Sequence, residues 1–117
     1  MPSGRDPDDF LPLRGVELDI LLGVVDRARH GYAILQEADA RTGGKALFEI
    51  PTLYRALRRM RDEGLIRTAS APAGEEEDPR REYWVATALG RQVLEAELER
   101  MQAVLSAGRA RLAPRKA

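Results

Sequence analysis

Apolar residues recur with a helical period in the first part of the chain. The first apolar stripe consists of Leu13, Val16, Ile20 and Val24. Positions three or four apart share one face of a helix, so this stripe predicts an amphipathic helix from Leu13 to about Arg29. Gly31 then breaks the pattern. The second apolar face consists of Tyr32, Leu35 and Ala38. The second helix is expected to end at Gly43 and Gly44, because glycine readily adopts the left-handed conformation after a helix.

A third helix is expected in the stretch IPTLYRALRRMRDEGLI, which spans Ile50–Ile66. Its apolar stripe consists of Leu53, Ala56, Leu57 and Met60. Pro51 suits the first turn, where a missing N–H has no helical partner, and Gly64 suits the left-handed position after the last turn. The polar side chains off the apolar stripe include Thr52, Arg55, Arg58 and Arg59.

Two stretches with a preference for extended backbone follow the third helix. They are LIRTAS (65–70) and REYWVA (81–86), and the second contains adjacent aromatic and β-branched residues that favour strands. The segment between them, APAGEEEDPR (71–80), is rich in proline, glycine and acid, which is typical of a loop. The sequence therefore predicts a β-hairpin.

A last helix is expected after Thr87, whose hydroxyl suits an N-cap, from about Ala88 to about Ala110. Its apolar positions have heptad-like spacing and consist of Leu94, Leu98, Met101, Leu105 and Leu112. Acidic residues lie in the first half of this helix, and Arg109 and Arg111 lie near its end. This order of charges complements the helix dipole.

Formal charges balance over the whole chain, which has 19 basic and 19 acidic residues. Attraction to a polyanion must therefore come from local clustering. The segment Ile50–Arg67 carries five arginines against two acidic residues. Such an excess on an exposed helix face suits phosphates and guanine edges. The alternative is a solvated helix face with pairs four residues apart, such as Arg58 with Asp62 or Arg59 with Glu63.

Composition limits the remaining classes of function. The chain has 117 residues, of which 44% are hydrophobic, and this is enough for one domain with a core. It contains no cysteine and a single histidine, so disulfides, thiolate chemistry and cysteine-based metal sites are excluded. It also lacks a glycine-rich phosphate loop and clustered metal ligands, so neither an enzyme, a metal site nor a cofactor is expected. The N-terminal residues are polar and acidic, unlike a signal peptide, and the apolar stretches are too short to span a membrane. A cytoplasmic protein is therefore predicted.

The order helix, helix, basic amphipathic helix, hairpin, helix is that of a winged helix-turn-helix, in which the third helix enters the major groove. The predicted fold is mainly α with a small β-hairpin, and a C-terminal dimerisation helix follows the winged helix-turn-helix domain. The predicted divisions are a flexible N-terminal arm (1–11), a DNA-binding domain (12–86), a dimerisation helix (87–112) and a flexible tail (113–117).

Three blocks of sequence resemble the PadR family of bacterial transcriptional regulators. They are HGYAI (30–34), TLYRALRRMRDEGLI (52–66) and REYWVATALGR (81–91), and they occur in the order and at the spacing of the family. The resemblance covers about Leu11–Leu105. It implies a homodimer that binds a roughly palindromic operator near a promoter, usually as a repressor. Some members of the family release DNA when a small aromatic or hydrophobic compound binds.

The sequence departs from the family pattern at three places. Pro51 replaces the usual glycine before Thr-Leu-Tyr, and Arg55 replaces a frequent proline and adds a side chain able to reach DNA. Many members carry a basic or mixed hairpin tip, whereas this loop contains Glu75, Glu76, Glu77 and Asp78. Phosphates would repel these carboxylates, so the tip is predicted to point away from the duplex or to be mobile.

The residues predicted to contact DNA are Thr52, Tyr54, Arg55, Arg58, Arg59, Arg61, Arg67, Arg80 and Arg81. Arg55 and Arg59 lie four apart on one exposed arc and are the best candidates for base or phosphate contacts. Hydroxyls at Thr52 and Tyr54 can bond phosphates; the alternatives are a helix cap for Thr52 and partial burial for Tyr54. The alternative for the hairpin arginines (67, 80 and 81) is pairing with Glu82 or its neighbours.

Three further side chains have structural interpretations. The single histidine, His30, lacks partners for a metal site or a catalytic triad, and is expected to cap the second helix or to pack between helices. Tyr32 and Trp84 are expected in the core. A ligand-stacking role is the alternative for Trp84.

The apolar stripe of the last helix extends past the winged-helix core and would form an exposed patch in a monomer. Dimerisation would bury it against the partner's last and first helices. A two-fold dimer would also place two recognition helices about one DNA turn apart, as a palindromic site requires. The alternative function is a winged-helix protein–protein interaction module that does not bind DNA.

Overall fold

The computed structural model describes residues 5–45, 48–76 and 78–115. The helices are a 3-10 helix, η1 (Pro7–Phe10), and the α-helices α1 (Gly15–Val24), α2 (Gly31–Thr42), α3 (Ile50–Asp62) and α4 (Ala88–Leu112). The strands are β1 (Arg29–His30), β2 (Ile66–Ala69) and β3 (Tyr83–Ala86). The predicted mainly α fold with a small β-hairpin is therefore confirmed.

The strands form one antiparallel sheet in the order β1-β3-β2. The predicted hairpin pairs Thr68 with Trp84, and Arg29 faces Trp84 from the other side of β3. The prediction that the first helix continues to about Arg29 is wrong, because α1 ends at Val24 and Arg29 belongs to the sheet. The guanidinium of Arg29 donates to the carbonyl oxygen of Gly23 and thereby links the two ends of the short connection between α1 and β1.

The hydrophobic core lies where α1, α2 and α3 meet the hairpin and the start of α4. Its largest fully buried apolar side chains are Ile20, Leu21, Ile34, Leu53, Leu57, Met60, Leu65, Ile66 and Trp84. The predicted stripe of α3 and the predicted core position of Trp84 are thus confirmed. Tyr32 was predicted wrongly, because it is 56% exposed. It lies two residues before Ile34, which places it on nearly the opposite face of α2.

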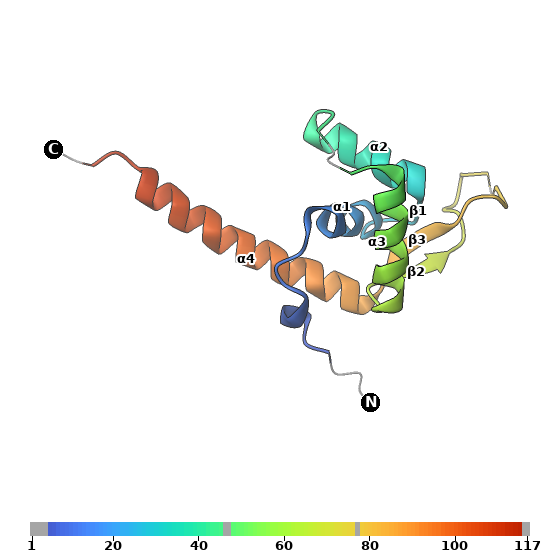
Figure 1. The fold of residues 1–117 in the computed structure, drawn as a ribbon, viewed down its shortest axis with the longest axis horizontal. Helices are drawn as coiled ribbons and strands as arrows, with labels where there is room; N and C mark the ends of the chain where they lie inside the picture. The colour runs from blue at the N-terminus through green and yellow to red at the C-terminus, as the bar shows by residue number, and fades with distance from the viewer. Residues whose placement is uncertain (1–4, 46–47, 77, 116–117) are drawn as a thin grey trace.

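Helix α4 leads away from the other elements, and the loop between β2 and β3 lies at the opposite end of the molecule (Figure 1). Only the first turns of α4 pack on the core, through Gly90, Val93, Leu94 and Glu97. From Leu98 onward the helix is exposed. This arrangement gives the molecule its long dimension of 65 Å.

The predicted flexible arm over residues 1–11 contains an element that was not predicted, because residues 7–10 form η1. The carboxylate of Asp6 accepts a hydrogen bond from the N–H of Asp8 at 2.9 Å and caps η1. Pro7 suits the first position of η1, and the guanidinium of Arg5 lies 5.6 Å from the centre of the Phe10 ring. Helix η1 packs against α4.

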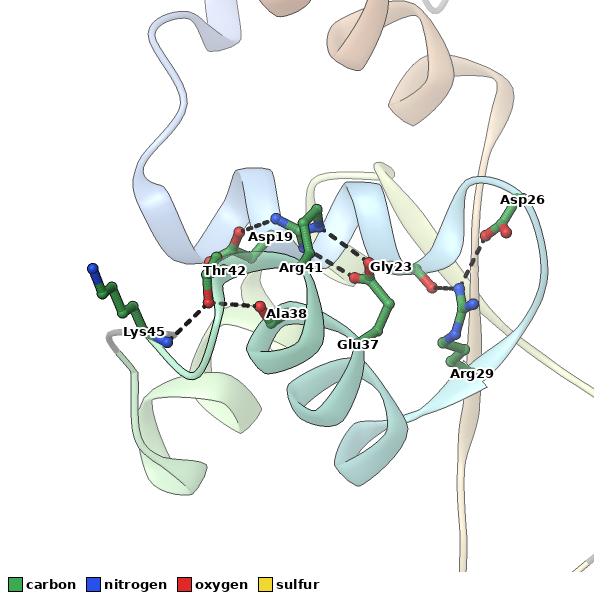
Figure 2. A network of polar contacts seen from close by, with 9 residues as sticks. All are labelled: Asp19, Gly23, Asp26, Arg29, Glu37, Ala38, Arg41, Thr42 and Lys45. Carbon is green, nitrogen blue, oxygen red and sulfur yellow. Dashed lines mark hydrogen bonds and ion pairs between the residues drawn. The ribbon is translucent and has the colours of Figure 1, made fainter.

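A cluster of polar contacts fixes α2 on α1 (Figure 2). Arg41 of α2 donates to Asp19 of α1 at 3.0 Å and to both carboxylate oxygens of Glu37. The bond to Glu37 is the main cause that raises the pKa of Arg41. Gly43 follows α2 with a φ of 68°, so the predicted glycine end of this helix is confirmed.

Candidate nucleic-acid interface

Helix α3 presents two free arginines opposite its buried stripe. Arg55 is exposed and donates to the hydroxyl of Thr52 at 3.3 Å. Arg58 is also exposed, and neither guanidinium has an acidic partner among the described residues. Thr52 does not cap the helix, because the N-cap position belongs to Glu49. Two cations on the outer face of a rigid helix can reach both phosphates and base edges in a major groove.

Arg59, the other candidate that the sequence singled out, leans toward α1. Its Nη2 lies 3.2 Å from Oε2 of Glu17, and its side chain is 38% exposed. The pairs considered as alternatives, Arg58 with Asp62 and Arg59 with Glu63, are not formed between these described residues. Instead, Asp62 pairs with Arg61 at 3.2 Å. Arg55 and Arg59 are therefore not equivalent, although they are neighbours on the helix surface.

Tyr54 of α3 and Tyr32 of α2 lie on the side of α3 that faces the hairpin. Tyr54 is 37% exposed, and its hydroxyl lies directly against Gly31, where an added Cβ would meet it at 2.5 Å. Together with Tyr32 it borders a shallow hollow of about 190 Å³, lined also by His30, Arg80, Arg81 and Glu82. Phenol hydroxyls, arginines and the N-terminal end of α2 form a combination that suits a phosphate. Tyr32 was not predicted to lie at this hollow. The signal in the sequence was its position two residues before Ile34, which places it on the face of α2 opposite the core.

His30 caps α2, as predicted. Its Nδ1 accepts a hydrogen bond from the N–H of Ala33 at 3.2 Å, and its ring packs edge-on against Tyr83 at 5.4 Å. Burial lowers the pKa of His30, and the positive charge of Arg81 adds to this. A neutral imidazole with an unprotonated Nδ1 is the form that can cap the helix.

The arginines at the start of β3 have an acidic neighbour in the hairpin loop. The guanidinium of Arg80 donates two hydrogen bonds of 3.1 Å to Asp78, and the backbone N–H of Arg80 donates a third of 2.9 Å. The Nε of Arg81 lies 3.9 Å from the same carboxylate. The bonds from Arg80 lower the pKa of Asp78 to about 2. Among the described residues, the alternative pairing with Glu82 is not formed; Arg80 and Arg81 pair with Asp78 instead. Arg67 is exposed and donates to the carbonyl of Thr68 at 3.4 Å.

The acidic hairpin tip is tied to the body of the protein at one point. Glu75 pairs with Arg27, in the loop between α1 and β1, at 2.9 Å. The carboxylate of Glu75 is thus held at Arg27. Glu76 is exposed, and Glu77 lies outside the described residues.

The predicted dimerisation stripe has two parts in the structure. Leu94 is 5% exposed and belongs to the core. The exposed part consists of Leu98, Met101, Leu105 and Leu112, together with Val104. A hollow of about 320 Å³ lies on this face between Arg100, Met101, Val104 and Leu105. These exposed side chains form an apolar surface along the second half of α4.

Within the described part of the chain, no group of three or more histidine, aspartate or glutamate side chains is placed to hold a metal ion. None of the helices in this part is both long and apolar enough to cross a membrane.

The fold has close counterparts among solved structures. A PadR-like transcriptional regulator from Bacillus cereus superposes with a TM-score of 0.70 at 22% identity, over 86% of this chain and 93% of that one. A PadR family transcription regulator from Clostridium difficile gives 0.67 at 20% identity, over 86% of this chain and 100% of that one. Bacillus subtilis PadR, solved in complex with operator DNA, gives 0.59 at 22% identity, over 73% of this chain and 47% of that one.

These similarities show the winged-helix fold. No protein with a curated description matches the sequence. Residues 20–96, which run from the second half of α1 through α2, α3 and the hairpin into the start of α4, match the model of the transcriptional regulator PadR-like family. The chain therefore belongs to the PadR-like family of transcriptional regulators.

Proposed function

We propose that this protein is a dimeric, sequence-specific DNA-binding regulator that acts as a repressor and reads its operator with α3. The observation that carries the proposal is the pair of arginines, Arg55 and Arg58, on the exposed face of α3 without acidic partners among the described residues. Family membership supports it, and so does the operator complex of Bacillus subtilis PadR, which has the same fold.

The proposed contacts divide into base readers and phosphate binders. Arg55 and Arg58 reach guanine edges or nearby phosphates from the middle of α3. Hydroxyls at Thr52, Tyr54 and Tyr32 donate to phosphates at the two sides of the helix. Arg61, Arg67, Arg80 and Arg81 surround this face, and the last two exchange their bonds with Asp78 for bonds with phosphate.

The exposed part of the α4 stripe is the proposed dimer surface. Five large apolar side chains, each at least 40% exposed, would remain in water in a single chain. A second copy that covers them also gives a two-fold axis and hence a palindromic operator. Repression then follows from occupancy of DNA near a promoter. A small aromatic or hydrophobic effector would compete with the second copy for the apolar hollow beside Met101 and Leu105.

A protein–protein interaction module is the second candidate function. The specific observations in its favour are the net charge of zero and the acidic hairpin loop. The two candidates differ in how binding responds to salt. A protein that binds phosphates releases counterions, so its affinity for a duplex must fall steeply as salt rises.

The test starts with a duplex that the wild-type protein selects from a random-sequence pool. Binding is followed by fluorescence anisotropy over a salt series. We expect the Arg55→Ala/Arg58→Ala variant to lose at least about tenfold in affinity and about two units of salt slope. Arg109→Ala/Arg111→Ala removes the same charge from the exposed end of α4 and should keep the slope. Salt-insensitive binding, or equal losses in both variants, would contradict DNA reading by α3.

The dimer is tested by sedimentation equilibrium. Leu105→Glu places a charge in the exposed stripe and should produce a monomer with weaker DNA binding. Gln102→Glu places the same charge elsewhere on the exposed half of α4 and should leave the dimer intact. A wild-type monomer at micromolar concentration would exclude this part of the proposal.

A further inference from the structure

Three hydrogen bonds, joined by the backbone between Leu13 and Arg14, connect α4 to α3. Glu97 of α4 accepts a hydrogen bond from the N–H of Leu13 at 2.9 Å. The next residue, Arg14, donates its N–H to Oε1 of Glu17 at 3.1 Å. The other carboxylate oxygen of Glu17 accepts from Nη2 of Arg59 on α3 at 3.2 Å. The carboxylates of Glu97 and Glu17 thus both hold the segment between η1 and α1, and Glu17 also binds an arginine of α3.

Both carboxylates are shielded from water. The side chain of Glu97 is 2% exposed and that of Glu17 is 13% exposed. Both oxygens of each group are engaged, because Glu97 also accepts from Arg100. Charge-assisted bonds in such places are strong and directional, so these side chains fix the backbone and the guanidinium that they contact.

This geometry separates the roles of neighbouring arginines. A guanidinium that reads DNA must present its donors to the groove, as Arg55 and Arg58 can. Arg59 instead donates to Glu17. If it turned to DNA, it would leave a largely buried carboxylate without its cation, which is costly.

We propose that Arg59 and Glu17 are positioning residues for DNA binding, and that Glu97 extends their action to α4. The Glu17–Arg59 pair sets the angle of α3 on α1, and the bonds at Leu13 and Arg14 tie that angle to α4. This inference rests on the proposed function. It adds that a displacement of α4, such as a change at the dimer surface, is transmitted to the recognition helix through this polar chain.

The proposal is tested with the selected duplex and the same salt series. The variants are Arg59→Gln, Glu17→Gln and the double variant, in which net charge equals that of wild type and two amides can still form a hydrogen bond. Asp62→Asn serves as the control for removal of an acidic group near DNA. Titration of each variant with excess duplex gives the fraction of protein that is able to bind, and every affinity is corrected for this fraction.

We expect each single variant to bind the selected duplex about tenfold more weakly, with an unchanged salt slope. The double variant should bind more tightly than either single variant, because its two amides restore a link between the helices. Asp62→Asn should bind at least as well as wild type. The loss in Glu17→Gln is the decisive result, since removal of a negative charge otherwise favours DNA.

Three results would overturn the proposal. Arg59 would be a DNA contact if Arg59→Gln lowered the salt slope by about one unit and Glu17→Gln tightened binding. Neither residue would position α3 if both single variants bound like wild type. If the wild-type protein selected no duplex, the proposed function itself would fail, which the variants are not needed to show.

The extension to α4 has its own variant. Glu97→Met removes the acceptor for Leu13 at similar volume and should weaken specific binding several-fold in protein that remains dimeric. In combination with Arg59→Gln, the two losses should not add, because both interrupt one chain. Additive losses would show that Glu97 acts independently and would overturn this part.

Discussion

Glu97 offers the sharpest test of how the N-terminal segment is attached to the domain. It is a fully buried carboxylate in α4, and it receives the N–H of Leu13 and the guanidinium of Arg100. In Glu97→Ala both donors lose their acceptor. The segment from η1 to the start of α1 would then lose its hydrogen bond to α4, while the bond from Arg14 to Glu17 would remain.

The expected loss of stability follows from these two bonds. A hydrogen bond to a charged acceptor contributes about 1.5–3 kcal/mol when its partner is left unsatisfied. The side chain of Arg100 is 42% exposed, so its pairing is screened by water and adds little to the loss. Removal of a buried charge offsets part of this loss. We therefore expect Glu97→Ala to lower the free energy of unfolding by about 2–3 kcal/mol.

The effect must depend on pH in a defined direction. The hydrogen bond from Arg100 is the main cause that lowers the pKa of Glu97 in the folded protein. An unfolded glutamate has a pKa of about 4.3, so the stabilisation is fully present above that pH and is lost as pH falls through the lower folded value. Glu97→Gln cannot titrate at this position. Its stability deficit should therefore shrink below about pH 4.

Urea unfolding followed by far-UV circular dichroism measures these differences, at one protein concentration because a dimer would unfold in a concentration-dependent way. Glu99→Ala is the matched control, since Glu99 is an exposed acid two residues away. It should change stability by less than about 0.5 kcal/mol. Equal effects of Glu97→Ala and Glu99→Ala would refute the assigned role of the buried carboxylate.

Three other substitutions have expected outcomes that the contacts decide. Gly90→Ala would place its Cβ 2.0 Å from the carbonyl oxygen of Leu65, so α4 must shift and urea unfolding should show a loss of about 3 kcal/mol. Gly31→Ala would press on the hydroxyl of Tyr54, so it should weaken DNA binding several-fold in anisotropy measurements while the fold persists. Asp78→Asn would release Arg80 and Arg81, just before β3, and should raise both DNA affinity and the salt slope.

Each of these substitutions has a control in the same chain. Gly108→Ala and Gly15→Ala add a Cβ that meets nothing within 4 Å, so neither should reproduce the effect of its counterpart. Glu76→Gln removes an acid from the same loop without releasing an arginine, and should raise affinity less than Asp78→Asn. Equal effects of the two loop variants would show that net charge alone decides, and a stable Gly90→Ala protein would contradict the close packing of Gly90 on the backbone of Leu65.

Local periodicity predicted the elements that have a strong apolar face. The stripe of α3 and the N-cap at Thr87 could be read from the sequence, because each depends on residues within one or two turns of one another. The two strands of the hairpin could be read from their β-branched and aromatic residues and from the loop composition between them. The end of α1 and the strand β1 could not. Arg29 and His30 are extended because they pair with Trp84 and Tyr83, which are more than fifty residues away in sequence.

Contacts made over long sequence distances also decide which charges are free. In the sequence, Arg55 and Arg59 are alike: each lies on the polar face of one basic helix. In the structure, a carboxylate of α1 engages Arg59, and no acid among the described residues engages Arg55. The bond between Glu17 and Arg59 has no signal in the sequence, since it depends on how α1 is set against α3, whereas the bond from Arg14 to Glu17 is a local cap of α1.

The same reasoning explains how a chain with no net charge can bind a polyanion. Several of its acidic side chains are already paired with arginines inside the domain, as Glu17, Glu75 and Asp78 illustrate. A paired acid and a paired arginine nearly cancel at the distance of a duplex, so the unpaired cations of α3 dominate the local field. Net charge therefore carries little information here. The salt slope should be set by the number of arginines on α3 and around it that have no acidic partner within the protein. Asp78→Asn raises that number by freeing Arg80 and Arg81, and it leaves α3 unchanged.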